Sequence, residues 1–223
     1  MDESLQLWRR AAAEGFAAFA LVFAGCGAIV ANASNDGALG TVGIAMVFGL
    51  IITVMVYATG HLSGAHINPA VTIAFTATRH FPLRDAFAYV GAQVLGAIAG
   101  AACLLAIWTA KPADLGATLP SVGVGSAFVY ETLLTMFLMF VIMAVATDAR
   151  AVGPAAAIAI GGTVGLDALF GGPVTGASMN PARSLGPAFA SGEFNDLWIY
   201  VTAPFAGALL GALIYQLVRG RAG

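Results

Sequence analysis

The stretch Ser63–Thr72, SGAHINPAVT, returns almost unchanged half a chain later within Thr175–Ala188, TGASMNPARSLGPA. Both copies contain Gly-Ala followed by Asn-Pro-Ala, and they align without a gap. Proline suits the first position of a helix, where its missing N–H costs nothing, and asparagine suits the cap before it. Each copy therefore predicts a helix that begins at a proline, Pro69 in the first and Pro181 in the second.

The sequence around both copies is strongly apolar. Of its 223 residues, 60% are hydrophobic and only 9% are charged, whereas soluble domains carry about 25% charged residues. A spanning helix needs about 20 apolar residues. The charge-poor segments indicate six such spans, near 11–31, 40–59, 85–108, 124–146, 154–170 and 197–218. The chain is therefore expected to be an all-α integral membrane protein in a lipid bilayer. Its net charge of −2 gives no reason to expect a nucleic-acid partner.

The first apolar segment resembles a signal peptide in position only. Signal peptides begin with a positively charged region, but this chain begins with MDESLQ, and Glu14 interrupts the apolar run. We therefore expect this segment to be retained as the first spanning helix.

The similarity between the two copies extends to their surroundings. Each copy is followed by a helix with a related stretch that starts at Tyr-Val, from Tyr89 or from Tyr200. Each copy is also preceded by a lone glutamate, Glu14 or Glu131. The sequence therefore contains an internal repeat, over about 8–108 and 124–218. Each repeat has the order helix, helix, Asn-Pro-Ala, helix. Because three spans per half is an odd number, the second half must be inverted in the membrane. The sequence predicts one transmembrane domain over 1–223, built as an inverted 3+3 repeat.

Each Asn-Pro-Ala copy opens a helix that is too short to span the membrane. A helix from Asn68 to Ala77 covers about 15 Å, half of the hydrocarbon core. Two such half-helices, entering from opposite faces, would meet at N-termini that each carry about half a unit of positive charge. The non-helical segments before them, 64–67 and 176–179, are tolerated at membrane depth only if protein buries them or they line a water-filled cavity. This pattern predicts a polar path through the protein.

With these features the chain resembles the aquaporin, or major intrinsic protein, family over essentially its whole length. The residues that carry the resemblance are GHLSGAHINPAVT (Gly60–Thr72), GASMNPARSLGPA (Gly176–Ala188) and the paired Glu14 and Glu131. It implies six transmembrane helices plus two re-entrant half-helices, one pore in each subunit and a homotetramer. It also implies a pore centre formed by the two Asn-Pro-Ala copies, Asn68, Pro69, Ala70, Asn180, Pro181 and Ala182.

The resemblance assigns further roles to the loops before the half-helices. Their carbonyls would form a ladder of acceptors for the permeating solute, from Gly64, Ala65 and His66 and from Gly176, Ala177 and Ser178. Glu14 and Glu131 would accept hydrogen bonds from these loops, since a carboxyl group inside a membrane is costly and normally paired. The alternative for both glutamates is a position at the membrane interface.

Arg183 is the only charged residue in the second copy. Arginine at the centre of a bilayer costs about 2.5–3.5 kcal/mol on insertion scales. The family resemblance places it at the outer constriction of the pore, together with Phe48, Ala168 and Ala177. The alternative role for Arg183 is a structural ion pair with Asp167. The alternative for Asp167 is a carboxylate at the membrane interface. Two alanines leave a wide opening, which resembles the filter of plant nodulin-like intrinsic proteins and their bacterial relatives.

The resemblance implies a passive channel for water and small uncharged polar solutes, including glycerol-like polyols and metalloid acids, which excludes ions and protons. A strictly water-selective channel is the alternative. Neutral asparagines at the midplane argue against an ion-coupled transporter, which would need titratable groups there. No nucleophile–base pair or metal-ligand cluster suggests an enzyme, and neither a cofactor nor a metal is expected. A structural membrane protein of the same fold is a third alternative.

Lys and Arg residues predict the orientation in the membrane, since they concentrate in cytoplasmic loops. An N-terminus in the cytoplasm places seven of them on that side and only Lys111 outside, the seven being Arg9, Arg10, Arg79, Arg84, Arg150, Arg219 and Arg221. Both termini are therefore expected in the cytoplasm, with the protein in the plasma (inner) membrane.

Two further features concern packing. Cys26 and Cys103 lie in apolar runs and are expected to be buried small residues. The glycine pairs Gly96/Gly100 and Gly207/Gly211 have the small-xxx-small spacing that marks close contacts between membrane helices.

Overall fold

A computed structural model describes residues 6–148, 150, 151, 153 and 155–220 of the chain; Arg221 of the predicted cytoplasmic set lies outside these residues. Six apolar helices of membrane-spanning length run through the described part, which confirms the predicted all-α membrane fold. The first span combines α1 (Leu7–Leu21), a π-helical turn (Val22–Cys26) and α2 (Gly27–Ser34). The others are α3 (Gly40–Ser63), α5 (Leu83–Ile107), α6 (Val124–Thr147), α7 (Ala156–Thr175) and α9 (Leu197–Val218).

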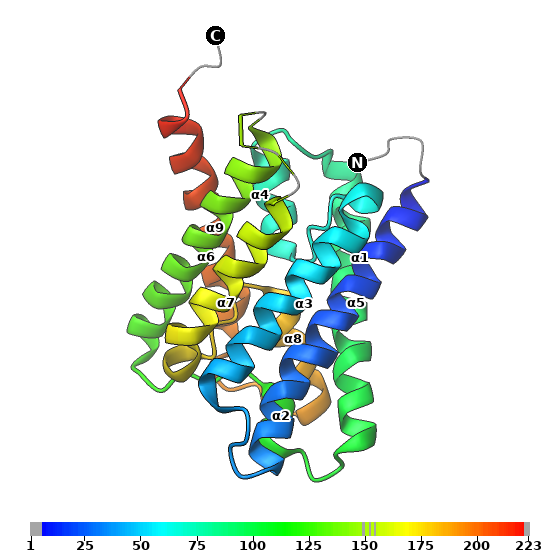
Figure 1. Ribbon diagram of the computed structural model, residues 1–223, viewed down its shortest axis with the longest axis vertical. Helices are drawn as coiled ribbons and strands as arrows, with labels where there is room; N and C mark the ends of the chain where they lie inside the picture. The colour runs from blue at the N-terminus through cyan, green and yellow to red at the C-terminus, as the bar shows by residue number, and fades with distance from the viewer. Residues whose placement is uncertain (1–5, 149, 152, 154, 221–223) are drawn as a thin grey trace.

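The two half-helices begin at the predicted prolines. They are α4 (Pro69–Ala77) and α8 (Pro181–Ser191), and they lie in opposite halves of the bundle (Figure 1). The side-chain oxygen of Asn68 accepts a hydrogen bond from the backbone N–H of Ala70 at 2.8 Å. Asn180 caps α8 in the same way, accepting from Ala182 at 3.0 Å. These caps fix where each half-helix starts.

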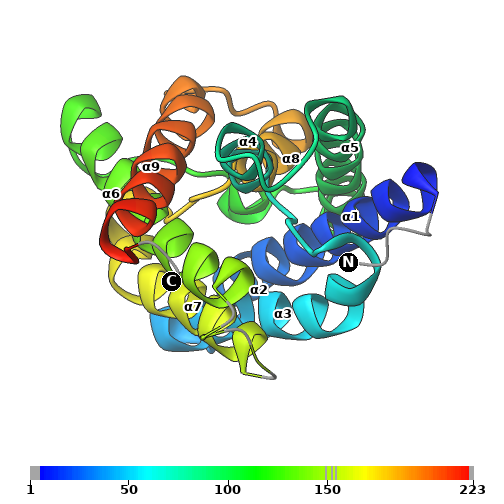
Figure 2. The same cartoon turned by 90° about the horizontal axis from the view of Figure 1, so that it is seen from above.

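The inverted repeat is visible in the way the helices pair. α1 packs on α5, α6 packs on α9, and α3 packs on α7. Viewed from above, these helices form a ring, and α4 and α8 lie between α5 and α9 (Figure 2). α1 begins and α9 ends at the same end of the molecule (Figure 1), as six spans require.

Small residues allow the paired helices to approach closely. A Cβ atom added to Gly96 or Gly100 would overlap the backbone of α1, and one added to Gly207 or Gly211 would overlap the backbone of α6. Both predicted glycine pairs are therefore confirmed as close helix contacts.

The two cysteines have different environments. Cys26 is buried, as predicted, but Cys103 on α5 is exposed, so the prediction of a buried Cys103 was wrong. In a membrane span the face toward lipid is as apolar as the face toward the core, as the exposed Phe87 and Leu95 of the same helix show. Apolar neighbours in the sequence therefore do not tell which way a small residue on a spanning helix points.

Candidate pore and selectivity filter

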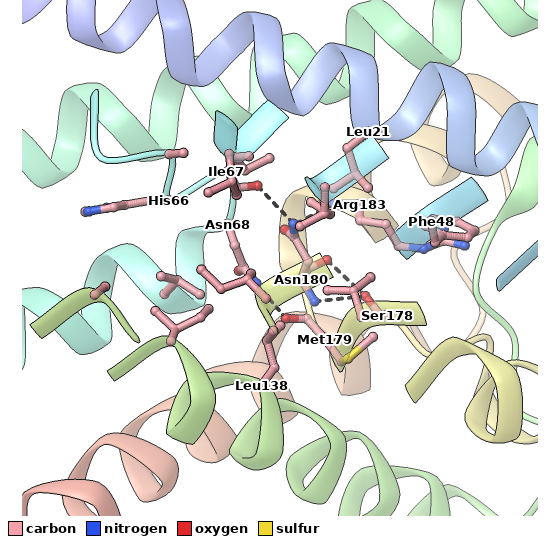
Figure 3. Close-up of a pocket in the computed structure, with 18 of the residues that line it drawn as sticks. Leu21, Phe48, His66, Ile67, Asn68, Leu138, Ser178, Met179, Asn180 and Arg183 are labelled. Carbon is pink, nitrogen blue, oxygen red and sulfur yellow. Dashed lines mark hydrogen bonds between the residues drawn. The ribbon is translucent and has the colours of Figure 1, made fainter. Parts of the chain in front are cut away.

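The two capping asparagines connect the halves of the molecule at its centre. Asn68 donates its side-chain N–H to the carbonyl of Met179 at 2.7 Å, and Asn180 donates to the carbonyl of Ile67 at 3.0 Å (Figure 3). Each bond joins one half-helix to the loop that leads into the other. Because a side-chain amide has two N–H groups, each asparagine keeps one further donor for a solute between the two helix ends.

The loops before the half-helices have the same unusual backbone. Left-handed φ angles of 91°, 48° and 57° occur at Gly64, Ala65 and Ile67, and angles of 87°, 43° and 53° recur at Gly176, Ala177 and Met179. Such angles are uncommon for residues other than glycine, so the surrounding structure must hold these loops in place.

Glu14 holds the first loop. Its Oε1 accepts from the hydroxyl of Ser63 at 2.6 Å and from the backbone N–H of His66 at 2.9 Å. Its Oε2 accepts from the N–H of Ile67 at 2.6 Å and from the side chain of Gln93 at 2.8 Å. Four donors around one carboxylate compensate for its burial.

Glu131 occupies the equivalent place at the second loop. Its Oε1 accepts from the hydroxyl of Thr175 at 2.7 Å and from the N–H of Ser178 at 2.9 Å. Its Oε2 accepts from the N–H of Met179 at 2.9 Å. Glu14 and Glu131 are both completely buried, which is incompatible with the interfacial alternative.

Arg183 lies at one end of the path, beside Phe48 (Figure 3). Its Nη1 donates to the carbonyl of Gly116 at 2.8 Å and to the sulfur of Cys26 at 3.3 Å. The guanidinium carbon lies 5.0 Å from the centre of the Phe48 ring, a distance at which cation–π attraction operates. Within the described part of the chain, Nε and Nη2 of Arg183 have no hydrogen-bond partner.

The alternative role for Arg183, an ion pair with Asp167, was wrong. No ion pair joins it to Asp167 among the described residues. Asp167 is not an interfacial carboxylate either, since only 1% of it is exposed and its Oδ2 has no partner in the described structure. Among the described residues that line the cavity, Ala168 is present and Asp167 is not.

A narrow cavity connects these groups, with about 60 Å³ of space for water-sized molecules. One water needs at least about 10–15 Å³ on this measure, so the cavity has room for more than one water. The cavity brings together the four predicted constriction residues, both capping asparagines and five of the six predicted ladder residues, Gly176 being the exception.

The apolar wall of the cavity contains Phe48, Ile52 and Val56 of α3 and the equivalent Ile160, Val164 and Ala168 of α7. Only Phe48 and Ala168 of this wall were predicted from the sequence. Each set is spaced by four residues, so it forms one stripe along its helix. That spacing is present in the sequence, but it is hidden because the other faces of these helices are also apolar. Cys26 and Gly116, the partners of Arg183, had no signal in the sequence.

Two histidines, His61 and His66, precede the first half-helix, and only His66 belongs to the site. Its Nδ1 lies 3.1 Å from the hydroxyl of Thr72, and its ring packs against those of Phe75, Phe81 and Tyr89. His61 is exposed. In the part of the chain that the structure describes, no group of three or more His, Cys, Asp or Glu residues could hold a metal ion.

A helical bundle that encloses a narrow polar path between two half-helices defines a membrane channel. Comparison with known proteins gives the family: the model of the major intrinsic protein family matches residues 1–215. Nodulin-26 of Glycine max is 50% identical over 97% of this chain and 80% of its own length. Aquaporin NIP1-1 of Oryza sativa subsp. japonica is 48% identical over 93% of this chain and 73% of its own.

A solved structure agrees with these relatives. The X-ray structure of the aquaglyceroporin from Plasmodium falciparum superimposes with a TM-score of 0.87 at 26% identity, covering 96% of this chain and 98% of that one. The chain belongs to the major intrinsic protein family. It is an integral membrane protein and a channel for water and small solutes.

Proposed function

We propose that the channel conducts water and uncharged polar solutes up to the size of glycerol, including metalloid acids, and excludes ions and protons. The observation that carries this proposal is the composition of the constriction. Of the four predicted constriction residues, Phe48 and Arg183 have large side chains, while Ala168 and Ala177 contribute methyl groups. A constriction narrow enough to exclude glycerol would need a bulkier residue in place of Ala168 or Ala177.

A polyol fits this constriction because its two edges differ. Its carbon edge slides along the Phe48 ring, and its hydroxyl oxygens accept from the guanidinium group of Arg183, a residue that lines the cavity. The solute hydroxyls in turn donate to the carbonyls of Ala177 and Ser178, which line the cavity. The asparagines then act as donors at the midplane, and the two glutamates keep the loop carbonyls in place.

Two sources of positive charge form the barrier to cations and protons. Arg183 places a fixed charge in a narrow site that is poorly hydrated, where charges interact more strongly than in water. The N-termini of α4 and α8 add about half a unit each at the centre. In pores of this kind an arginine and half-helix dipoles exclude cations. The neutral Asn68 and Asn180 offer no titratable group for coupling, so transport follows the solute gradient.

The assembly and orientation are part of the same proposal. Four copies form a homotetramer with one pore in each, and both termini face the cytoplasm from the plasma membrane. The excess of arginines in the loops at the end that holds the termini supports this orientation. No catalytic role is proposed, because members of this family are channels rather than enzymes.

Stopped-flow light scattering on proteoliposomes, with water, glycerol and urea compared, tests the solute range. The wild type should conduct both water and glycerol. Ala168→His should lower glycerol permeability at least about tenfold, equal to about 1.4 kcal/mol of added barrier, and water permeability much less. Ala168→Ser, which keeps the side chain small, is the matched control and should retain glycerol flux. A wild type that excludes glycerol would show that the strictly water-selective alternative is correct.

The passive character is tested on the same vesicles. An imposed pH or sodium gradient should leave glycerol flux unchanged, because the side chains that meet between the half-helices, Asn68 and Asn180, are neutral and do not titrate. Accumulation of solute against its own gradient would refute a passive channel.

A further inference from the structure

The first spanning helix changes its winding at the depth of the constriction. Between α1 and α2 the chain forms the π-helical turn Val22–Cys26. Such turns are rare, and they often occur at functional sites. Within this turn Gly25 and Cys26 are both buried, and each contacts one of the two large filter residues.

Gly25 lies directly behind Phe48. A Cβ atom at position 25 would overlap the Phe48 ring, so the ring occupies its place only because residue 25 has no side chain. A larger residue at this position must push the ring away from the π-helical turn and toward the opening.

Cys26 lies behind Arg183. Its sulfur accepts from Nη1 of Arg183 at 3.3 Å and lies 3.8 Å from the carbonyl oxygen of Gly116, which accepts from the same Nη1 at 2.8 Å. Gly116 has a left-handed φ of 80°, and a Cβ atom on it would come within 2.8 Å of the Cβ of Cys26. Thiol, carbonyl and guanidinium therefore form one packed triangle.

This triangle holds only one edge of the guanidinium. Nη1 has two partners, whereas Nε and Nη2 have none in the described structure although they are buried. A thiol is a weak acceptor, but together with the carbonyl of Gly116 it gives Nη1 two contacts that fix its position. With the sulfur removed, Nη1 keeps a single bond to Gly116 and the group is free to pivot about it. The methyl groups of Ala168 and Ala177 leave space for that movement into the opening.

We propose that the π-helical turn supports the selectivity filter and that Cys26 is a positioning residue, which acts through Arg183 on the discrimination between glycerol and water. This inference rests on the proposed pore function. It assigns a selectivity role to two residues, Gly25 and Cys26, that do not line the cavity.

Cys26→Ala and Cys26→Ser separate hydrogen bonding from packing. The two replacement side chains have similar volumes, and only serine keeps an acceptor. The ratio of glycerol to water permeability should fall about threefold in Cys26→Ala, the low end of what one hydrogen bond contributes, and stay near the wild-type value in Cys26→Ser. Cys103→Ala, at the exposed cysteine of α5, is the matched control and should change nothing. Equal losses in the alanine and serine variants, or no loss in either, would overturn the role of the thiol.

A second pair of variants tests the turn independently of Cys26. Gly25→Ala should lower the same ratio by moving the Phe48 ring, and Phe48→Ala added to it should restore glycerol flux by removing the overlap. A double variant as impaired as Gly25→Ala would show that position 25 does not act through the ring.

Measuring proton permeability distinguishes a wrong role for Cys26 from a wrong solute range. If the wild type excludes glycerol, only the proposed solute range is contradicted. The role of Cys26 in positioning Arg183 is then tested by proton permeability, which should rise in Cys26→Ala and not in Cys26→Ser.

Discussion

The two half-helices differ at the third residue after the capping asparagine, where α4 has Val71 and α8 has Arg183. Much of the nearby structure is the same in both halves. Tyr89 donates to the carbonyl of Ser63 at 2.7 Å, and Tyr200 donates to that of Thr175 at 2.7 Å. The shared residues build the loops, and the differing residue makes one end of the path charged.

The polar groups that pack against the loops before the two half-helices also differ. In the first half, Gln93 donates to Glu14 at 2.8 Å and to the hydroxyl of Thr72 at 3.1 Å. Pro204 occupies the position of Gln93 in the second half. There the hydroxyl group of Ser184 contacts those of Ser178 and Thr118 instead. An inverted repeat can therefore keep its geometry while each half acquires its own chemistry.

The largest expected effect comes from making the second half-helix resemble the first. Arg183→Val combined with Phe48→Ala should raise proton or small-cation conductance at least about tenfold, since it removes the fixed charge and widens the constriction while the half-helix field remains. Electrophysiology on oocytes or planar bilayers measures this conductance. Val71→Ala is the matched control at the equivalent position and should remain ion-tight. A double variant that stays ion-tight would show that the arginine is not part of the barrier.

A smaller effect is expected for the two glutamates. Glu14→Gln and Glu131→Gln each turn one accepting oxygen into a donor that faces a backbone N–H, which should destabilise the fold by about 1–3 kcal/mol. Glu131→Gln should cost more. Gln93, whose Oε1 has no partner among the described residues, can turn its amide to accept from the new side chain at position 14, whereas Pro204 cannot.

Thermal unfolding in detergent compares the two glutamine variants. The midpoint of Glu131→Gln should lie below that of Glu14→Gln. Gln93→Ala, added to each, should remove most of the difference. The opposite order of midpoints would contradict the compensation by Gln93.

The smallest effect is expected for the hydroxyls on the half-helices. Thr72→Val removes contacts to Asn68, His66 and Gln93, and Ser184→Ala removes two contacts. Each change should lower stability by about 1 kcal/mol and leave the ratio of glycerol to water permeability unchanged, because neither residue lines the cavity. A change in that ratio of more than about twofold, in either variant, would extend the filter beyond Arg183 and its partners.

Much of the architecture followed from local features of the sequence. The six spans, both half-helix starts and the inversion of the repeat depend on apolar length, proline and asparagine at helix starts, and an odd number of spans per half. These signals act over a few residues or one helix, so they survive in a single sequence. The predicted constriction residues depended instead on the family resemblance, and the structure places all four around one cavity.

Tertiary structure alone decided the environment of each residue inside the membrane. The partners of Arg183 lie 157 and 67 residues away, at Cys26 and Gly116. The burial of Asp167 and the exposure of Cys103 were not indicated by the sequence either. The physical reason is the solvent. In water a polar face marks the outside of a helix, but lipid is as apolar as the protein core, so the rotation of each spanning helix is set by the helices it packs against. The sequence by itself determined which segments cross or enter the membrane, and the packing determined which side chains meet there.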